Sequence, residues 1–185
     1  MTATAARRLW RRAARRWRSP PTALLVPVAG IGLDDAAAGL PPHVTVLYPF
    51  VPARRAGPEL ERDLRATFAH IPAFDFALTS VGRFPGVLYL APEPAAPFAA
   101  LTEACTRRWP EHPPYAGAYD EVVPHLTLAE GPEPPGLAEG WGRRLPLRAR
   151  AEALWLMAPG PGGRWRRVAD VPLGGVSGSR ASRSR

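Results

Sequence analysis

The sequence predicts an α+β domain in which two mainly antiparallel sheets, related by pseudo-twofold symmetry, flank a central cleft with two main helices outside. Its 185 residues are enough for one domain with a sizeable core, or for two small lobes that share a cleft. Segments with the period of a strand alternate with two segments of helical period. A His-x-Thr strand followed downstream by a hairpin occurs twice, and this repeat suggests the two related lobes.

The predicted elements begin after residue 20. About seven strands are expected, at residues 23–29, 43–50, 74–84, 86–92, 125–130, 148–159 and 163–173. Two amphipathic helices are expected at 57–71 and 95–109, because apolar residues recur there at helical spacing, as Leu60, Leu64 and Phe68 do in the first. Pro-Gly at 85–86 and Gly-Pro-Gly-Gly at 160–163 predict the turns of two hairpins.

The formal net charge of +8 is concentrated at the two ends of the chain. Residues 1–19 hold seven arginines and residues 174–185 hold three, with no acidic residue in either segment. The folded middle is therefore close to neutral. We expect an Arg-rich extension over 1–19 that is disordered or a basic helix, a folded domain over 20–174, and a disordered Gly/Ser/Arg tail over 175–185. These tails could make nonspecific contacts with nucleic acid or an anionic surface.

The composition excludes several other classes of protein. No segment approaches the roughly 18 apolar residues that a membrane span needs, and prolines interrupt the region where a secretory signal would have its apolar stretch. The single cysteine, Cys105, excludes an internal disulfide and fits a reducing cytoplasm. The sequence has no four-ligand Cys/His zinc pattern. We expect a cytoplasmic monomer with no metal and no cofactor.

Two strand segments each place a histidine and a threonine on one face. Side chains alternate between the two faces of a strand, so His43 and Thr45 share one face of HVTVL while the valines occupy the other. His125 and Thr127 do the same in HLTL. One such pair is common by chance, but two matched pairs in a chain with four histidines are not. Each strand therefore offers an apolar face to a core and a polar face to a cleft.

The two pairs supply a complete set of groups for phosphodiester chemistry. A neutral imidazole can take a proton from a nucleophile, and a protonated one can give a proton to a leaving oxygen. The adjacent threonine hydroxyls can donate to the non-bridging oxygens of the phosphate. In-line displacement at phosphorus needs this combination and no metal.

These segments resemble the two-histidine phosphoesterase superfamily and, more narrowly, bacterial proteins of the 2′-5′ RNA ligase family. The matching segments are HVTVLYPF, VGRF with GVLYLAP, YDEVVPHLTLAEG, and ALWLMAPGPGGRWRRVADVPLG. The resemblance covers roughly residues 21–174 and includes neither tail. It implies a bilobal fold with a central cleft.

The resemblance also implies an activity and a set of site residues. The expected activity is a cyclic phosphodiesterase acting on 2′,3′-cyclic phosphate ends of RNA or on a small cyclic nucleotide, with ligation as the reverse direction. By position, His43 and His125 would be the catalytic pair, and Thr45 and Thr127 would bind the phosphate oxygens. The resemblance does not say which histidine is the base and which the acid.

Four other residues are candidate substrate contacts. Phe50, Tyr115 and Tyr119 would lie near the cleft and could stack on a nucleobase, although core packing or loop anchoring explains each equally well. Arg83 follows a turn glycine and could meet a phosphate, or could be an ordinary surface charge. Structural positions are expected for the remaining histidines and the cysteine: a helix end for His70, an exposed loop for His112, and a buried helix face for Cys105.

One alternative function remains open at this point. The same cleft could belong to a non-catalytic module that binds RNA or a nucleotide without turnover, with the Arg-rich tails adding affinity. Pure binding does not need two imidazoles, however, and a purely structural protein would leave both of them unexplained.

Overall fold

The computed structural model describes residues 19–33, 39–119 and 121–174. Within these ranges eight strands form one sheet in the order β6-β3-β4-β5-β2-β1-β7-β8, and every neighbouring pair is antiparallel. The strands are β1 (Ala23–Pro27), β2 (His43–Leu47), β3 (Phe74–Phe84), β4 (Val87–Glu93), β5 (Leu126–Glu130), β6 (Leu147–Ala151), β7 (Ala153–Pro159) and β8 (Trp165–Pro172). The predictions for residues 1–18 and 175–185 lie outside the described residues.

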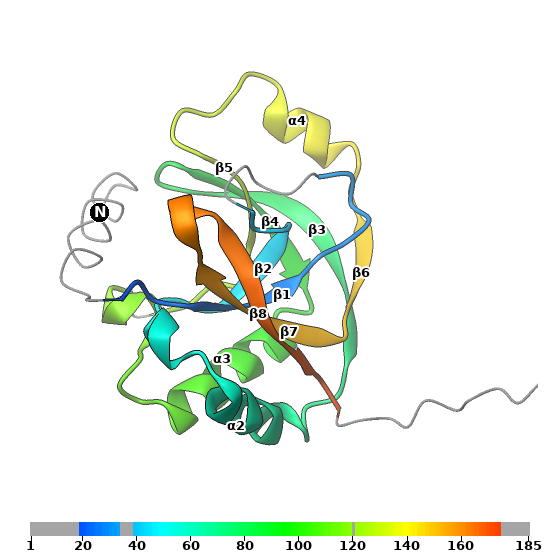
Figure 1. Ribbon diagram of the computed structural model, residues 1–185. Helices are drawn as coiled ribbons and strands as arrows, with labels where there is room; N and C mark the ends of the chain where they lie inside the picture. Colours follow the sequence, from blue (N-terminus) through cyan, green and yellow to red (C-terminus); the bar gives the residue numbers. More distant parts are fainter. Residues whose placement is uncertain (1–18, 34–38, 120, 175–185) are drawn as a thin grey trace, which may run out of the picture.

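The described chain contains three α-helices, of which the two longer ones pack together on one face of this curled sheet. They are α2 (Pro58–Phe68), α3 (Ala96–Arg108) and the short α4 (Leu137–Gly142), with 3₁₀ turns η1 (Ala53–Arg55), η2 (Pro114–Gly117) and η3 (Pro161–Gly163). Figure 1 shows α2 and α3 side by side beneath the strands, with α4 at the opposite end of the molecule. Pro58 is the first residue of α2, where its missing N–H costs nothing and its fixed φ favours the helix.

The predicted fold class is confirmed: an α+β domain with two mainly antiparallel four-stranded halves. The halves are β6-β3-β4-β5 and β2-β1-β7-β8, and they meet where β2 pairs with β5. One residue pair, Val44 opposite Leu126, carries this junction. The two expected sheets are therefore joined into one, with the two His-x-Thr segments side by side at the centre.

Neither hairpin pairs with the His-x-Thr strand that precedes it in the sequence. The β3–β4 hairpin follows β2 along the chain, yet it pairs with β5. The β7–β8 hairpin follows β5, yet it pairs with β1 beside β2. Each half of the sheet therefore combines segments from both halves of the sequence.

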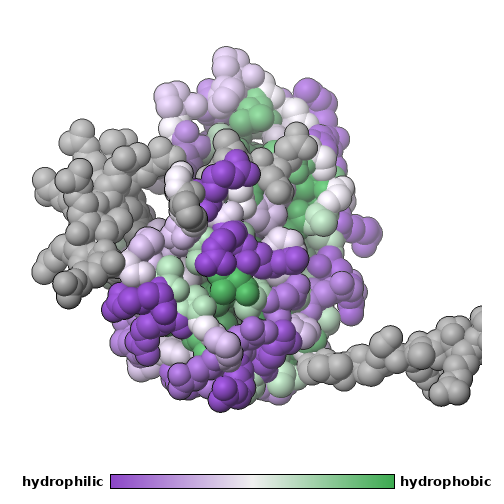
Figure 2. Space-filling model, viewed as in Figure 1, coloured by the Kyte–Doolittle hydropathy of each residue, from purple (hydrophilic) through white to green (hydrophobic). Residues whose placement is uncertain are grey.

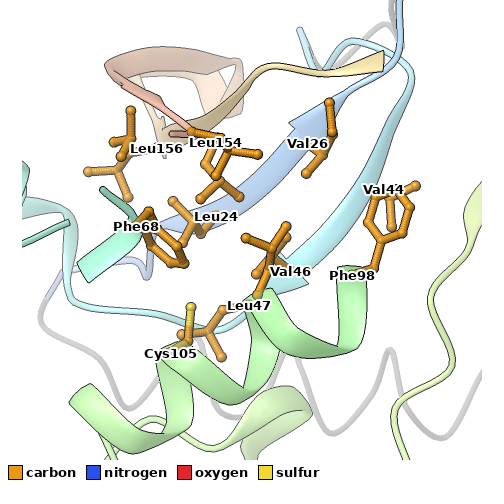
Figure 3. Packing of buried hydrophobic residues seen from close by; sticks show 14 of the residues in the cluster. Leu24, Val26, Val44, Val46, Leu47, Phe68, Phe98, Cys105, Leu154 and Leu156 are labelled. Carbon is orange, nitrogen blue, oxygen red and sulfur yellow. The ribbon is translucent and has the colours of Figure 1, made fainter. Parts of the chain in front are cut away.

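The main core lies between the sheet and α2 and α3 (Figure 3). Of the apolar residues of β2 and β5 that alternate with the His-x-Thr side chains, Val44, Val46 and Leu126 are at most 2% exposed and Leu128 is partly buried. They pack in one cluster with Phe68 of α2 and Phe98 of α3. The Thr102 hydroxyl of α3 donates to the Val46 carbonyl at 3.0 Å. This packing fixes which face of β2 and β5 points away from the helices.

Two features of the region after β5 differ from the predicted elements. The sequence predicts one strand over residues 148–159, but the chain breaks at Glu152 into β6 and β7, which pair with strands in opposite halves of the sheet. The Pro/Gly-rich connection contains α4, with Ala138 and Trp141 buried. No helix in the described part of the chain is both long and apolar enough to cross a membrane. On the face shown in Figure 2, hydrophilic residues predominate and hydrophobic residues form small separate areas.

Candidate active site

Both histidines are held by the same local device. Nδ1 of His43 lies 2.7 Å from the Pro41 carbonyl oxygen, and Nδ1 of His125 lies 2.8 Å from the Val123 carbonyl oxygen. A carbonyl oxygen only accepts, so Nδ1 carries the hydrogen and Nε2 of each neutral ring keeps its lone pair for other partners. A proline precedes each histidine. Proline fixes its own φ and restricts the residue before it to extended conformations, which favours this carbonyl position two residues upstream.

The strand register brings all four predicted residues together. Val44 lies opposite Leu126 in an antiparallel pair. Continuing that register by one residue in each direction places Thr45 opposite His125 and His43 opposite Thr127. Directly opposed side chains point to the same face. We call this face, opposite α2 and α3, the histidine face.

The threonines of the histidine face differ from every other threonine of the described chain. Five hydroxyl groups donate to a protein acceptor, those of Thr22, Thr67, Thr79, Thr102 and Thr106. Within the described residues, the hydroxyls of Thr45 and Thr127 make no hydrogen bond to the protein. Thr45 is half-buried and Thr127 is exposed. Two donors beside two imidazoles are therefore available to a ligand.

The surroundings of both histidines favour the neutral imidazole. Burial lowers the pKa of His43 below its ordinary value of 6.5; the Pro41 hydrogen bond opposes this shift, and the nearby charge of His125 adds to it. Burial likewise lowers the pKa of His125, against the hydrogen bond to Val123. Near neutral pH both rings are uncharged until an anion approaches.

Two aromatic rings pack against one side of His125. The rings of Phe84 and Tyr89 stack with centroids 4.3 Å apart, and both contact the imidazole, at 5.1 Å and 5.4 Å. Tyr89 lies opposite Thr127 in β5 and opposite Gly82 in β3. A Cβ atom on Gly82 would overlap the Tyr89 ring, so only glycine lets that ring lie flat over β3.

The other side of the histidine face has a different lining. Leu25 lies opposite Thr45, and Trp155 lies opposite Leu25. Leu25 belongs to a small second cluster with Ala23 and Met157, against which Tyr48, Trp155 and Trp165 also pack. The guanidinium of Arg167 lies over the Trp155 ring, 4.2 Å from its centroid.

Two of the candidate substrate contacts, Phe50 and Arg83, have other partners in the structure. Phe50 is fully buried, and its ring packs edge-on against Trp109 and His112, so the structure gives it the core-packing role. Arg83 is exposed and forms a bidentate ion pair with Glu133, at 2.9 and 3.0 Å, as a surface charge does. The prediction of an exposed loop position for His112 is wrong, because its side chain is only 15% exposed.

Tyr115 and Tyr119 lie at the far end of β2. The Tyr115 N–H donates to the Tyr48 carbonyl at 2.8 Å, and the two predicted tyrosine rings contact each other at 5.4 Å. Tyr115 has φ of 52°, a left-handed conformation that is uncommon outside glycine. Burial raises the pKa of Tyr115 to about 12, whereas Tyr119 is 48% exposed. Their role as substrate contacts remains a prediction.

The sequence analysis did not single out Phe84, Tyr89, Trp155 or Arg167. Strand alternation could have placed Tyr89 on the face opposite Leu88 and Leu90, but only the strand order puts it beside His125. The signal available for the histidine geometry was the Pro-His pair at 42–43 and again at 124–125. As predicted for a core residue, Cys105 is fully buried.

Other possible sites in the described chain are limited. No three His, Cys, Asp or Glu side chains of the described residues gather closely enough to hold a metal ion. An open depression of about 530 Å³ lies between β3 and α4, lined by residues that include Thr79, Arg83 and Glu139. None of the four His-x-Thr side chains lines it.

The paired His-x-Thr arrangement on a curled antiparallel sheet is that of a two-histidine phosphoesterase. The family model of the 2′-5′ RNA ligase superfamily matches residues 6–162, and the chain belongs to this superfamily. No curated protein matches the chain in sequence.

Solved structures agree on the fold. Escherichia coli LigT complexed with 3′-AMP superimposes with a TM-score of 0.55 at 16% identity, covering 83% of this chain and 98% of LigT. TT0787 of Thermus thermophilus superimposes with a TM-score of 0.53 at 17% identity, covering 94% of both chains. Escherichia coli LigT complexed with ATP gives a TM-score of 0.53 at 16% identity, with the same coverage as the 3′-AMP complex.

Proposed function

We propose that this protein is a cyclic phosphodiesterase that opens 2′,3′-cyclic phosphates at RNA ends or on small nucleotides. The observation that carries the proposal is the matched set on the histidine face: two imidazoles fixed by identical carbonyl contacts, each opposite an unbonded threonine hydroxyl. Membership of the superfamily supports a phosphoesterase or ligase-like role.

In the proposed reaction, water attacks phosphorus and one ribose oxygen leaves. One neutral imidazole takes the water proton through Nε2, and the other, protonated at Nε2, gives its proton to the leaving oxygen. One P–O bond forms and one P–O bond breaks, so the product is a 2′- or 3′-phosphomonoester. Hydroxyl donors from Thr45 and Thr127 hold the non-bridging oxygens while charge develops on them. If a ribose hydroxyl of a second RNA end took the place of water as the nucleophile, the same displacement would join the two ends, which is ligation.

The electrostatics of the free protein suit this division of labour. Because burial lowers the pKa of both histidines, an unprotonated imidazole is available at neutral pH to act as the base. An incoming phosphate brings negative charge next to the rings and raises both pKa values. The second imidazole can therefore acquire its proton as the substrate binds.

Several observations support a nucleotide as the substrate. The similar Escherichia coli LigT has been solved with 3′-AMP and with ATP, and 3′-AMP is one of the two products of opening adenosine 2′,3′-cyclic phosphate. The aromatic rings of Phe84 and Tyr89 border the histidine face here. Tyr115 and Tyr119, at the end of β2, are further candidates for contact with a base.

The test is hydrolysis of 2′,3′-cyclic mononucleotides and of RNA oligomers with cyclic ends, in EDTA, with the product phosphate position determined by phosphorus NMR. We expect turnover by the unmodified protein. His43→Gln and His125→Gln should each lower kcat by about 10²–10⁴-fold, the usual contribution of a general acid or base. His70→Gln is the matched control, because His70 is exposed at the end of α2.

Full activity in the His43→Gln/His125→Gln double variant would refute the acid–base proposal. Tight binding of the cyclic nucleotides with no turnover of any of them would instead favour the non-catalytic binding module. Thermal unfolding of each variant separates loss of chemistry from loss of the fold.

A further inference from the structure

Arg167 is a cation on the histidine face that the proposed chemistry does not use. It lies opposite Met157, whose side chain is in the same small cluster as Leu25, the residue opposite Thr45. Directly paired residues share a face of the sheet. The side chain of Arg167 therefore points to the same side of the sheet as the two threonines.

The guanidinium of Arg167 is held in place from two directions. It stacks over the Trp155 ring at 4.2 Å from the centroid, and its Nη1 lies 3.3 Å from Oδ2 of Asp170. Stacking occupies the flat face of the guanidinium and leaves N–H groups at its edge. The side chain is still 49% exposed, so those remaining N–H groups face solvent. A fixed, partly exposed guanidinium loses little freedom when it binds an anion.

The position of this cation sets what it could bind. Trp155 lies two strands away from Thr45, through Leu25, and neighbouring strands are about 4.8 Å apart. The Trp155 backbone is therefore about 10 Å from that of Thr45, measured across the sheet. A phosphate held between Thr45 and Thr127 would already have its donors. An anion bound by Arg167 would therefore be a second group, separate from the reacting phosphate.

We propose that Arg167, held over Trp155, is a second phosphate subsite that binds the phosphate of the nucleotide next to the cyclic end of an oligonucleotide. The proposal rests on the proposed function, since it takes the reacting phosphate to lie at the His-x-Thr pairs. Arginine suits this role because its fork of N–H donors matches two phosphate oxygens. The protein would then act faster on an RNA end than on the same cyclic mononucleotide.

The test compares two substrates that differ by one nucleotide: adenosine 2′,3′-cyclic phosphate and the ApA dinucleotide with the same cyclic end. Arg167→Met removes the charge but keeps an unbranched side chain over Trp155. We expect kcat/KM for the dinucleotide to fall about tenfold, the effect of one charged hydrogen-bonding contact, and the mononucleotide value to stay within about twofold. Arg166→Met is the matched control, because Arg166 is exposed and adjacent but lies opposite Ala158, on the other face.

Salt dependence gives a second readout that a merely structural role would not change. One phosphate contact to a single strand contributes about 0.7 to the slope of log affinity against log salt. The dinucleotide slope should therefore decrease by about 0.7 in Arg167→Met and remain unchanged in Arg166→Met. Calorimetric affinities for 3′-AMP and for ApA 3′-phosphate supply the same comparison without turnover.

The outcomes separate this subsite from the proposed function. Equal losses on both substrates, or no loss on either, would overturn the subsite while leaving the phosphodiesterase intact. If the unmodified protein opened neither substrate, the proposed function would fail. The binding comparison would then decide the subsite alone: selective weakening of the dinucleotide complex in Arg167→Met supports it, and equal affinities overturn it.

Discussion

The two halves of the sheet present identical chemistry at their junction and different surfaces on either side of it. On the β5 side of the junction, Thr127 is paired with Tyr89 of β4, and Tyr89 is paired with Gly82 of β3. On the β2 side, Thr45 is paired with Leu25 of β1, and Leu25 is paired with Trp155 of β7. The large aromatic ring is therefore one strand away from the threonine on the first side and two strands away on the second.

This difference separates what the reaction requires from what the substrate requires. Acid–base chemistry at phosphorus needs two similar imidazoles and two donors, which the pseudo-twofold axis supplies. A nucleotide has no such symmetry, because its base and its phosphates differ. We therefore interpret the aromatic, uncharged side at Tyr89 and the Arg167 side as the parts of the face that orient a substrate.

The largest expected effects on the symmetric part, after the histidines themselves, come from the threonines. Thr45→Val and Thr127→Val keep the branched shape of the side chain and remove the hydroxyl. A hydrogen bond to a charged oxygen is worth about 1.5–3 kcal/mol, so each change should lower kcat/KM by about 10-fold to 100-fold. Steady-state kinetics on a 2′,3′-cyclic mononucleotide measure it.

Serine at either position should restore most of the lost activity, since it returns the hydroxyl. Thr106→Val is the control, because the Thr106 hydroxyl donates within α3 to Glu103. Similar losses at Thr45 and Thr127 would show that both halves hold the phosphate. Activity undiminished by either valine would contradict their assignment.

Gly82→Ala tests the aromatic side and should have the next largest effect. The added Cβ would overlap the Tyr89 ring, which Phe84 and His125 hold in place. Overpacking of this kind costs about 1–3 kcal/mol, and the displaced ring would disturb His125. We expect a lower Tm and about tenfold lower kcat/KM.

A matched glycine shows whether the loss is specific. Gly140→Ala adds the same methyl group within α4, where no atom lies within 4 Å of the new Cβ. The Gly82→Ala/Tyr89→Leu double variant removes the overlapping ring and should recover stability. If Gly82→Ala behaved like Gly140→Ala, the packing account of Tyr89 would be wrong.

The sequence was sufficient to predict the symmetric part of the molecule. Alternation alone placed Val44 and Val46 in the core and His43 and Thr45 on the other face, and the structure agrees. Helical spacing likewise identified Leu60, Leu64 and Phe68 as the buried stripe of α2. These features are local, with periods of two or about 3.6 residues, so they are visible in a single segment.

The asymmetric part depends on which strands become neighbours, and local patterns do not carry that information. Tyr89 meets His125 because β4 pairs with β5, not with β2. The alternation of residues 148–159 runs unbroken through Glu152, although the chain changes sheet half there. Phe50 falls within the predicted strand 43–50, but β2 ends at Leu47, so the burial of Phe50 in the structure comes from the turn after the strand and its packing against Trp109 and His112.

The pH profile is a smaller and more specific test of the same comparison. The proposed mechanism requires one neutral and one protonated histidine, so it predicts that kcat/KM is highest between the two macroscopic pKa values of the free pair. Burial lowers both pKa values below 6.5. The optimum of kcat/KM should therefore lie on the acid side of pH 6.5.

A substitution next to one histidine should shift only the part of the kcat/KM profile that reports the pKa of that histidine. Tyr89→Leu admits water to His125, reduces the burial that lowers its pKa, and should move that limb toward higher pH. Leu25→Ala opens the opposite side and is the comparison variant. An optimum above pH 7 in the unmodified protein would contradict the effect of burial on the pair.

The smallest expected effect is on stability, and its sign follows from the same pKa shifts. The unfolded chain protonates its histidines near pH 6.5, whereas His43 and His125 in the folded protein protonate only at lower pH. The unfolded state therefore binds more protons as the pH falls below 6.5. Stability is full above that pH and decreases toward the folded pKa values, by at most about 1.4 kcal/mol per pH unit for each histidine.

Urea unfolding at pH 7.5, 6.5 and 5.5 measures this dependence. His43→Gln and His125→Gln should each flatten the decline, and their relative effects show which half of the sheet contributes more. The double variant should keep some pH dependence, because burial also lowers the pKa of His112. If the stability of the unmodified protein were constant from pH 7.5 to 5.5, the two imidazoles would not be desolvated in the folded state, and the basis for a neutral base at the site would be lost.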